Sequence, residues 1–222
     1  MINTFVALDI ETTGLNPAED KIIEIGMAKI SDGEIVDSYS TLVNPGIRIS
    51  ERITMITGIT DDMVEGKPAI ISDIVDFTKD MPILGHNVIF DYSFIKKAAV
   101  NSGLDFKKSG IDTLKLSRRL LPEVPHKTLE YLCGYFGIDA GNSHRAYDDA
   151  LSAMKLYEKL HQIKPDDTGF DELIELNYSA KKDSPITAAQ RKHGLEPVED
   201  IDALTKSRAS KLIDNIISNY GK

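Results

Sequence analysis

The sequence predicts an α/β fold in which a mixed β-sheet, part antiparallel and part parallel, is flanked by helices. Three features of the chain support this expectation. β-rich segments come first and are joined by a tight-turn signal, helices and short strands then alternate, and this alternation stops after Lys164. A meander followed by βα units is typical of a mixed sheet with helices on its faces.

The opening part of the chain is predicted to form an antiparallel meander of three strands. Segments 4–10, 21–30 and 34–43 are rich in β-forming apolar residues, as buried strands are. Asp32-Gly33 separates the second segment from the third. This pair favours a tight hairpin, because such turns need residues that tolerate a positive φ.

Helices and short strands alternate over the next part of the chain. The short strands are apolar runs, and the second of them ends at an acid, Asp112. Repeated βα units place such strands parallel to one another. The predicted strands are 82–85 and 109–112, and the predicted helices are 68–79, 89–101, 113–120, 127–136 and 145–162.

The chain changes character after the last of these helices. We expect a first domain at 1–164, a linker at 165–184 with a short helix within 170–182, and a small helical C-terminal appendage at 185–222. Apolar residues at helical spacing predict a helix near 205–219 of the appendage. Two interpretations of this helix stay open: it docks on the body of the first domain or on a partner, or it shows only intramolecular packing or a loosely tethered end.

Acidic residues occur at positions where apolar elements face the core. Asp9 and Glu11 lie two apart in the first predicted strand, so their side chains share one face. Carboxylates that close raise each other's pKa unless a cation lies between them. Asp91 begins the stripe of its helix that continues with Phe94 and Ile95. An acid in a first helical turn is also favoured by the helix dipole, so Asp91 alone decides nothing.

Helical periodicity separates two neighbouring acids, Asp149 and Asp148. Asp149 shares a face with Ala153 and Leu156, whereas Asp148 shares a face with Ser152 that we expect to be solvated. Burying an unpaired carboxylate is costly, and convergence with the other acids around cations removes that cost. Oxygen ligands suit Mg²⁺ or Mn²⁺ better than Zn²⁺.

His144 lies just before the same predicted helix, five residues ahead of Asp149. An imidazole accepts a proton near neutral pH, which a general base for water must do. A lone histidine before a helix is more often a surface or capping residue. Its spacing from an inward acid makes the general-base interpretation the stronger one here.

Charge and composition limit the kinds of partner. The 222 residues carry a net charge of −9 and no basic tract, which argues against a long electrostatic footprint on nucleic acid. The negative charge does not argue against a site that binds a few terminal nucleotides, because metal ions supply positive charge there. A single cysteine, no signal-peptide pattern and no long apolar run predict a cytoplasmic protein without a membrane partner.

Three segments together resemble a known family. Residues 9–14 (DIETTG), 85–91 (GHNVIFD) and 144–150 (HRAYDDA) resemble the three exonuclease motifs of the DnaQ-like, DEDDh 3′–5′ exonucleases, such as proofreading epsilon subunits and PolC exonuclease domains. Segment 54–61 (TMITGITD) resembles the family's linking segment. The resemblance covers about residues 3–162, no catalytic position departs from the pattern, and it implies a ribonuclease H-like fold.

The resemblance also implies the chemistry. Asp9, Glu11, Asp91 and Asp149 would hold two Mg²⁺ (or Mn²⁺) ions, and His144 would act as the general base that activates water. Nucleoside 5′-monophosphates would leave one at a time from single-stranded or frayed DNA 3′ ends, in proofreading or repair. Further residues are expected to contact the terminal nucleotides: Thr12, Thr13, Gly14, Leu15, His86, Asn87 and Phe90.

Two alternatives to this function stay open. The first is the same chemistry on RNA 3′ ends, since the choice depends on contacts to the 2′-OH. The second is a non-catalytic module that tethers a polymerase, which the presence of all five chemical positions disfavours. A polymerase or another replication or repair protein is the expected protein partner, bound through the C-terminal region.

Overall fold

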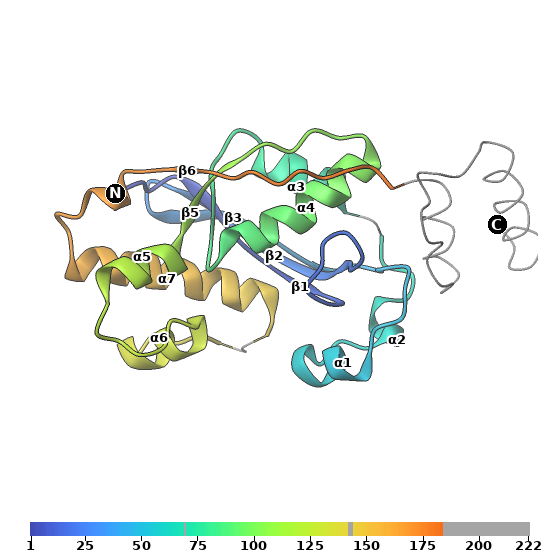
Figure 1. The fold of residues 1–222 in the computed structure, drawn as a ribbon, viewed down its shortest axis with the longest axis horizontal. Helices are drawn as coiled ribbons and strands as arrows, with labels where there is room; N and C mark the ends of the chain where they lie inside the picture. Colours follow the sequence, from blue (N-terminus) through green and yellow to red (C-terminus); the bar gives the residue numbers. More distant parts are fainter. Residues whose placement is uncertain (69, 142–143, 184–222) are drawn as a thin grey trace, which may run out of the picture.

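A six-stranded sheet forms the centre of the computed structural model, which describes residues 1–68, 70–141 and 144–183 (Figure 1). The predicted C-terminal appendage lies outside the described residues. The strands are β1 (Phe5–Thr12), β2 (Ile22–Ser31), β3 (Glu34–Leu42), β4 (Ile83–Gly85), β5 (Ser109–Asp112) and β6 (Ile174–Glu175).

The strand order β3-β2-β1-β4-β5-β6 confirms the predicted mixed sheet. β3, β2 and β1 form the antiparallel meander, while β4 and β5 continue parallel to β1. β6 then pairs antiparallel with β5 at the edge. Because β1 is central and neighbours the parallel strands, side chains at its end meet elements from both halves of the chain.

Helices cover both faces of the sheet. Figure 1 shows α5, α6 and α7 on one side and α3 and α4 on the other. No helix within the described ranges has the length and apolarity needed to cross a bilayer. The helices are α1 (Glu51–Thr57), α2 (Asp61–Val64), α3 (Ile71–Thr78), α4 (Val88–Ser102), α5 (Thr113–Leu120), α6 (Leu129–Phe136) and α7 (Ala146–Ile163), with a 3-10 turn η1 (Thr168–Phe170).

β1 divides the core into two halves by the alternation of its side chains. Phe5 and Ala7 pack among residues of α5, α6 and α7, whereas Val6, Leu8 and Ile10 pack among residues of α3 and α4. Side chains two apart in a strand share a face. Asp9 therefore continues the face of Phe5 and Ala7, which α7 covers.

The structure differs from the sequence prediction in two segments. Two short helices, α1 and α2, lie between β3 and α3, where no helix was predicted. The short helix expected within 170–182 is wrong, because this segment begins at the last residue of η1 and contains β6 instead. The free edge of β5 offers unpaired backbone groups, and Ile174 and Glu175 pair there with Gly110 and Ser109.

The segment that follows α7 packs closely on the sheet and its helices. Phe170 is buried, and its carbonyl accepts hydrogen bonds from the Ile2 N–H (2.8 Å) and the Tyr157 hydroxyl (3.1 Å). Leu176 is also buried, and its side chain fills the space above Gly110. Much of the expected linker at 165–184 thus shares the core of the first domain.

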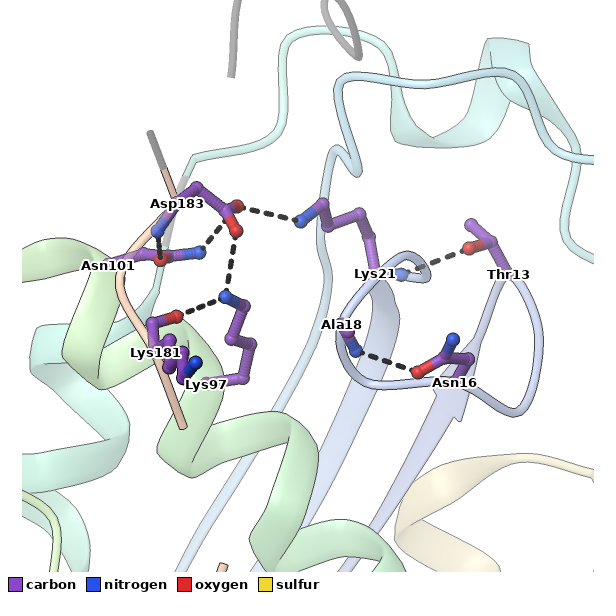
Figure 2. A network of polar contacts seen from close by, with 8 residues as sticks. All are labelled: Thr13, Asn16, Ala18, Lys21, Lys97, Asn101, Lys181 and Asp183. Atoms are coloured by element: carbon purple, nitrogen blue, oxygen red, sulfur yellow. Dashed lines mark hydrogen bonds and ion pairs between the residues drawn. The ribbon is translucent and has the colours of Figure 1, made fainter. Parts of the chain in front are cut away.

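Asp183, the last described residue, is held at the surface of this body (Figure 2). Its carboxylate accepts hydrogen bonds from Lys97 Nζ (2.7 Å) and Asn101 Nδ2 (3.1 Å), both on α4. Lys21 Nζ lies 4.0 Å away, from the loop that follows β1. Asp183 is therefore fixed to α4.

Replacing Phe170 with alanine tests whether this segment belongs to the domain. The ring is 1% exposed and contacts Tyr157 and His161, so Phe170→Ala should cost about 3–5 kcal/mol of unfolding free energy. The control Leu173→Ala, at a side chain that is 45% exposed, should cost less than about 0.5 kcal/mol. Equal and small effects in chemical denaturation would show that the segment is only a tether.

Candidate metal-dependent nuclease site

A cavity of about 370 Å³ opens at the ends of β1 and β4, beside the first turns of α4, α6 and α7. It brings together residues from three distant parts of the sequence. Most of them are polar, which is unusual so close to a sheet core. The lining residues are Asp9, Ile10, Glu11, His86, Asn87, Phe90, Asp91, Thr128, Leu129, Glu130, His144 and Asp149.

The first two acids come from the end of the central strand. Asp9 and Glu11 point to the α7 face of β1, and β2 pairs beside them, with Glu11 opposite Glu24. The regular pairing of β1 with β2 shifts between Glu11 and Thr12, where the strand ends. Both carboxylates line the cavity.

Asp91 comes from the first turn of α4, on the other side of β1. It is 3% exposed, and its Oδ1 accepts a hydrogen bond from the Ile10 N–H (3.2 Å). Asn87 begins the helix with a left-handed φ of 77°, and its N–H donates to Asp112 Oδ1 (3.2 Å). Asparagine tolerates this conformation better than most residues, so the turn directs α4 toward the end of β1.

Asp149 and His144 complete the cluster from the start of α7. The His144 N–H donates to Asp149 Oδ2 (3.0 Å), so the carboxylate fixes the backbone that carries the histidine. Asp149 lines the cavity and Asp148 does not, as the helical spacing predicts. The solvated face expected for Asp148 and Ser152 is wrong, because segment 138–141 packs over it: Ser152 is 1% exposed and Asp148 is half-buried.

Burial and mutual repulsion disfavour ionisation of these acids. Burial, then repulsion from Asp91 and Asp149, raises the pKa of Asp9 well above its ordinary value. Burial raises the pKa of Asp91 to about 8. Burial and Asp149 raise the pKa of Glu11 to about 7. The pKa of Asp149 is also raised by burial, against the lowering effect of the His144 N–H.

The chemistry of the donor set fits divalent metal ions. Within the described part of the chain, no Lys, Arg or His side chain forms an ion pair with any of the four carboxylates. Glu11, His144 and Asp149 each offer one potential ligand atom, and these three atoms lie within 4.8 Å of one another. Carboxylates that repel one another and form no ion pair with a protein cation are matched to hard ions with oxygen ligands, such as Mg²⁺ or Mn²⁺.

Other residues with expected substrate contacts are placed differently. Asn87 and Phe90 line the cavity, with the half-buried Phe90 ring 5.0 Å from that of the core residue Phe94. The segment Thr12, Thr13, Gly14 and Leu15 does not line it. This segment forms a loop in which the Thr12 hydroxyl donates to the Gly14 carbonyl (2.6 Å), and Leu15 is 83% exposed.

His86 lines the cavity but uses both ring nitrogens on protein partners. Nδ1 lies 2.9 Å from the Thr113 hydroxyl and Nε2 lies 2.6 Å from the Lys127 carbonyl. Burial lowers the pKa of His86, which favours the neutral ring. These contacts connect the end of β4 to the segment before α6 and favour a bracing role for His86.

Sequence reasoning missed two groups near the cavity. Thr128, Leu129 and Glu130 reach it from the start of α6, and no motif marked them. Glu24 lies in the predicted strand 21–30. In the structure it is 2% exposed and forms an ion pair with Arg145 (2.8 Å) beside the acids. An acid between isoleucines in a buried strand was the available signal.

The fold and the site together define the class of protein: a ribonuclease H-like exonuclease with an acidic, metal-suited cavity at the end of the central strand. The exonuclease family model RNase_T matches residues 6–157. The chain belongs to this family, among the DnaQ-like 3′–5′ exonucleases.

Individual relatives agree with this assignment. DNA polymerase III PolC-type of Clostridium perfringens is 41% identical over 155 residues, which are 68% of this chain and 11% of that protein. Exonuclease X, solved with a 5′-overhanging duplex DNA, is 27% identical with a TM-score of 0.57, covering 72% of this chain and 93% of its own. Escherichia coli ExoI, solved with ssDNA, shares the fold at a TM-score of 0.67 and 23% identity, covering 77% and 42%.

The raised pKa values predict how pH affects the metal-free protein. In the unfolded chain these acids have pKa values of about 4. Below that pH they are protonated in both the folded and the unfolded state, and their contribution to stability is fully present. This contribution is lost as the pH rises through the pKa values of the folded protein, about 7 for Glu11 and about 8 for Asp91. The Tm of the metal-free chain should therefore fall between about pH 5 and pH 8, and Mn²⁺ should restore it most at the upper end.

Asp91→Asn provides the matched comparison, because it removes one buried titrating group at similar volume. Its thermal melts should depend less on pH and respond less to Mn²⁺ than those of the wild type. Identical pH profiles for the two proteins, with and without Mn²⁺, would contradict the electrostatic account of the cavity.

Proposed function

We propose that the chain is a metal-dependent 3′–5′ exonuclease that hydrolyses the terminal phosphodiester of single-stranded or frayed DNA and releases nucleoside 5′-monophosphates. One observation carries the proposal: four acids from β1, α4 and α7 converge with His144 on one cavity. Membership of the exonuclease family supports it. Proofreading or repair is the proposed context.

Asp9, Glu11, Asp91 and Asp149 are the proposed ligands of two Mg²⁺ or Mn²⁺ ions. Such ions, when bound, supply Lewis acidity toward a phosphodiester and its attacking water. The protein contributes the positions of the four carboxylates. Asp91 is held by the Ile10 N–H and Asp149 by the His144 N–H, so both are oriented before substrate arrives.

His144 is the proposed general base. Its side chain is exposed to the cavity, and its backbone N–H is anchored to Asp149 (3.0 Å), so the imidazole and the acid cluster move together. An imidazole at this place can take the proton that water loses when it attacks phosphorus. A non-catalytic tethering module would have no need of this arrangement.

DNA is the proposed substrate, in preference to RNA. The PolC-type relative is named as a DNA polymerase, and the solved structures of Exonuclease X and ExoI contain DNA. The terminal base is proposed to stack on Phe90, since aromatic stacking tolerates any base. The exposed Leu15 is proposed to contact the next base from the neighbouring loop.

A polymerase, or another replication or repair protein, is the proposed protein partner. In the PolC-type relative the matching region is a small part of a much longer polymerase chain, which supports such a context. The C-terminal region is the proposed contact. Asp183, the last described residue, is bound to Asn101, at the far end of α4 from Asp91.

A pair of neighbouring acids tests the proposed ligand set. Asp149→Asn should lower the rate of mononucleotide release from a 3′-labelled DNA oligonucleotide in Mn²⁺ by at least about 10²-fold, because it removes a charge that binds the ions. Asp148→Asn, one position along and outside the cavity, should keep the wild-type rate. Equal rates for the two variants would remove Asp149 from the site, and wild-type cleavage in EDTA would refute the metal requirement.

Matched DNA and RNA oligonucleotides test the proposed substrate. With Mg²⁺, kcat/KM should be higher for DNA, because the 2′-OH is an additional polar group for which the proposal provides no partner. The control is the DNA strand with a single ribonucleotide at its 3′ end, which shows whether the 2′-OH of the terminal nucleotide alone determines the preference. Faster trimming of RNA would assign the chain to the exoribonucleases of this fold.

A further inference from the structure

We propose that Glu24, Gly26 and Arg145 form a seat on β2 that fixes the start of α7, and that Glu24 and Arg145 are thereby positioning residues for His144 and Asp149. This inference rests on the proposed function, because it concerns the residues that act in the hydrolysis. It concerns a buried acid beside the cavity, Glu24, that the proposed chemistry does not use.

The Glu24 carboxylate is fully occupied by the segment that carries the general base. Its Oε1 accepts from Arg145 Nη2 (2.8 Å) and Nε (3.1 Å), and its Oε2 accepts from Arg145 Nε (3.3 Å) and from the Ala146 N–H (3.2 Å). A guanidinium that contacts both oxygens of a carboxylate constrains distance and angle together. Glu24 is thus committed to α7, although it lies opposite the proposed ligand Glu11 in the sheet.

The same contact completes the N-terminus of α7. The first N–H groups of a helix have no partner within the helix, and Arg145, which precedes the first residue, makes no side-chain cap. Glu24 accepts the first of these, from Ala146, and does so from a different element of the fold. Asp149 accepts the N–H of His144 from within the helix. Two acids therefore fix the short segment from His144 to Ala146 from both sides.

Gly26 lets the backbones of β2 and α7 touch. A Cβ atom at Gly26 would lie 2.1 Å from the Tyr147 nitrogen and 2.4 Å from the Ala146 carbonyl carbon. Both are backbone atoms that cannot rotate away. Glu24 and Gly26 lie two apart and share one face of β2, so the contact and the ion pair act on the same turn of α7.

The His144 backbone itself needs such support. Its φ is 63°, a left-handed conformation that costs a residue with a Cβ about 1–2 kcal/mol. The residue stays in this conformation only if its neighbours hold it there. Asp149 holds its N–H, and Arg145, the next residue, is held by Glu24. Releasing Arg145 would let His144 relax away from the acids.

Arg145 also limits the charge that Glu24 adds to the cavity. The Glu24 carboxylate is among the groups that raise the pKa of Glu11, and the Arg145 guanidinium lowers it. The ion pair therefore lies close enough to act on the acids of the cavity as well as on the start of α7.

The test compares Arg145→Ala, Glu24→Gln, the double variant and Gly26→Ala with the wild type. Arg119→Ala is the matched control, because Arg119 also pairs with an acid, Asp167, is similarly exposed and lies outside the cavity. For each full-length protein, kcat and KM on a DNA oligonucleotide are measured across pH in Mn²⁺. Thermal melts and calorimetric titration with Mn²⁺ accompany the kinetics.

We expect Arg145→Ala to lower kcat by about 10²-fold with little change in KM, because the general base is misplaced while the substrate contacts remain. Glu24→Gln, which keeps the shape, should lose less and retain the Mn²⁺ stoichiometry, because Glu24 is not a ligand. The double variant should be no worse than Arg145→Ala, since the two residues act as a unit. Arg119→Ala should match the wild type.

Several outcomes would overturn the seat. Folded Arg145→Ala and Glu24→Gln proteins with wild-type kcat would refute it. A lower Mn²⁺ stoichiometry in Glu24→Gln would make Glu24 a ligand instead. If Gly26→Ala fails to fold, the isosteric Glu24→Gln still decides. An inactive wild type would refute the proposed function and the seat with it, whereas active variants beside an active wild type would refute the seat alone.

Discussion

Repulsion among buried carboxylates at the end of β1 is the constraint on which the rest of the site depends. Asp9, Glu11, Asp91 and Asp149 lie where a sheet protein normally places apolar groups, and burial raises the pKa of each. A fold that only needed to be stable would avoid this arrangement. Divalent cations turn the same repulsion into attraction, so the cost in the metal-free protein and the affinity for metal have one origin.

The architecture brings the acids together because each stands at an end of a secondary-structure element. β1 contributes two through strand alternation, α4 contributes one from its first turn, and α7 contributes one from its own first turn. The turns are fixed by backbone hydrogen bonds to the acids themselves, as between Ile10 and Asp91. In the proposed mechanism structural support and chemistry therefore use the same atoms, and the proposed seat of α7 on β2 would extend this principle to Glu24.

Local periodicity predicted much of this from the sequence, and contacts between distant residues account for the remainder. The meander follows from β-forming apolar segments and the Asp32-Gly33 turn, and the separation of Asp149 from Asp148 follows from the helical repeat of 3.6 residues. The place of Glu24 between isoleucines marked it as unusual, but its role depends on pairing with Arg145, 121 residues away. β6 and the burial of Phe170 could not be predicted from the local sequence either, because they depend on an open edge of the sheet. The nucleotide contact expected for Leu15 follows from the family resemblance alone, and it forms only when a substrate is bound.

The central claim is that the acid cavity is a divalent metal site, and a crystal grown with Mn²⁺ tests it most directly. Anomalous diffraction at the manganese edge should show density between the carboxylates of Asp9, Glu11, Asp91 and Asp149, with the side chains drawn toward it. A well-ordered crystal with no anomalous density in the cavity, and with those carboxylates turned away from one another, would contradict the account.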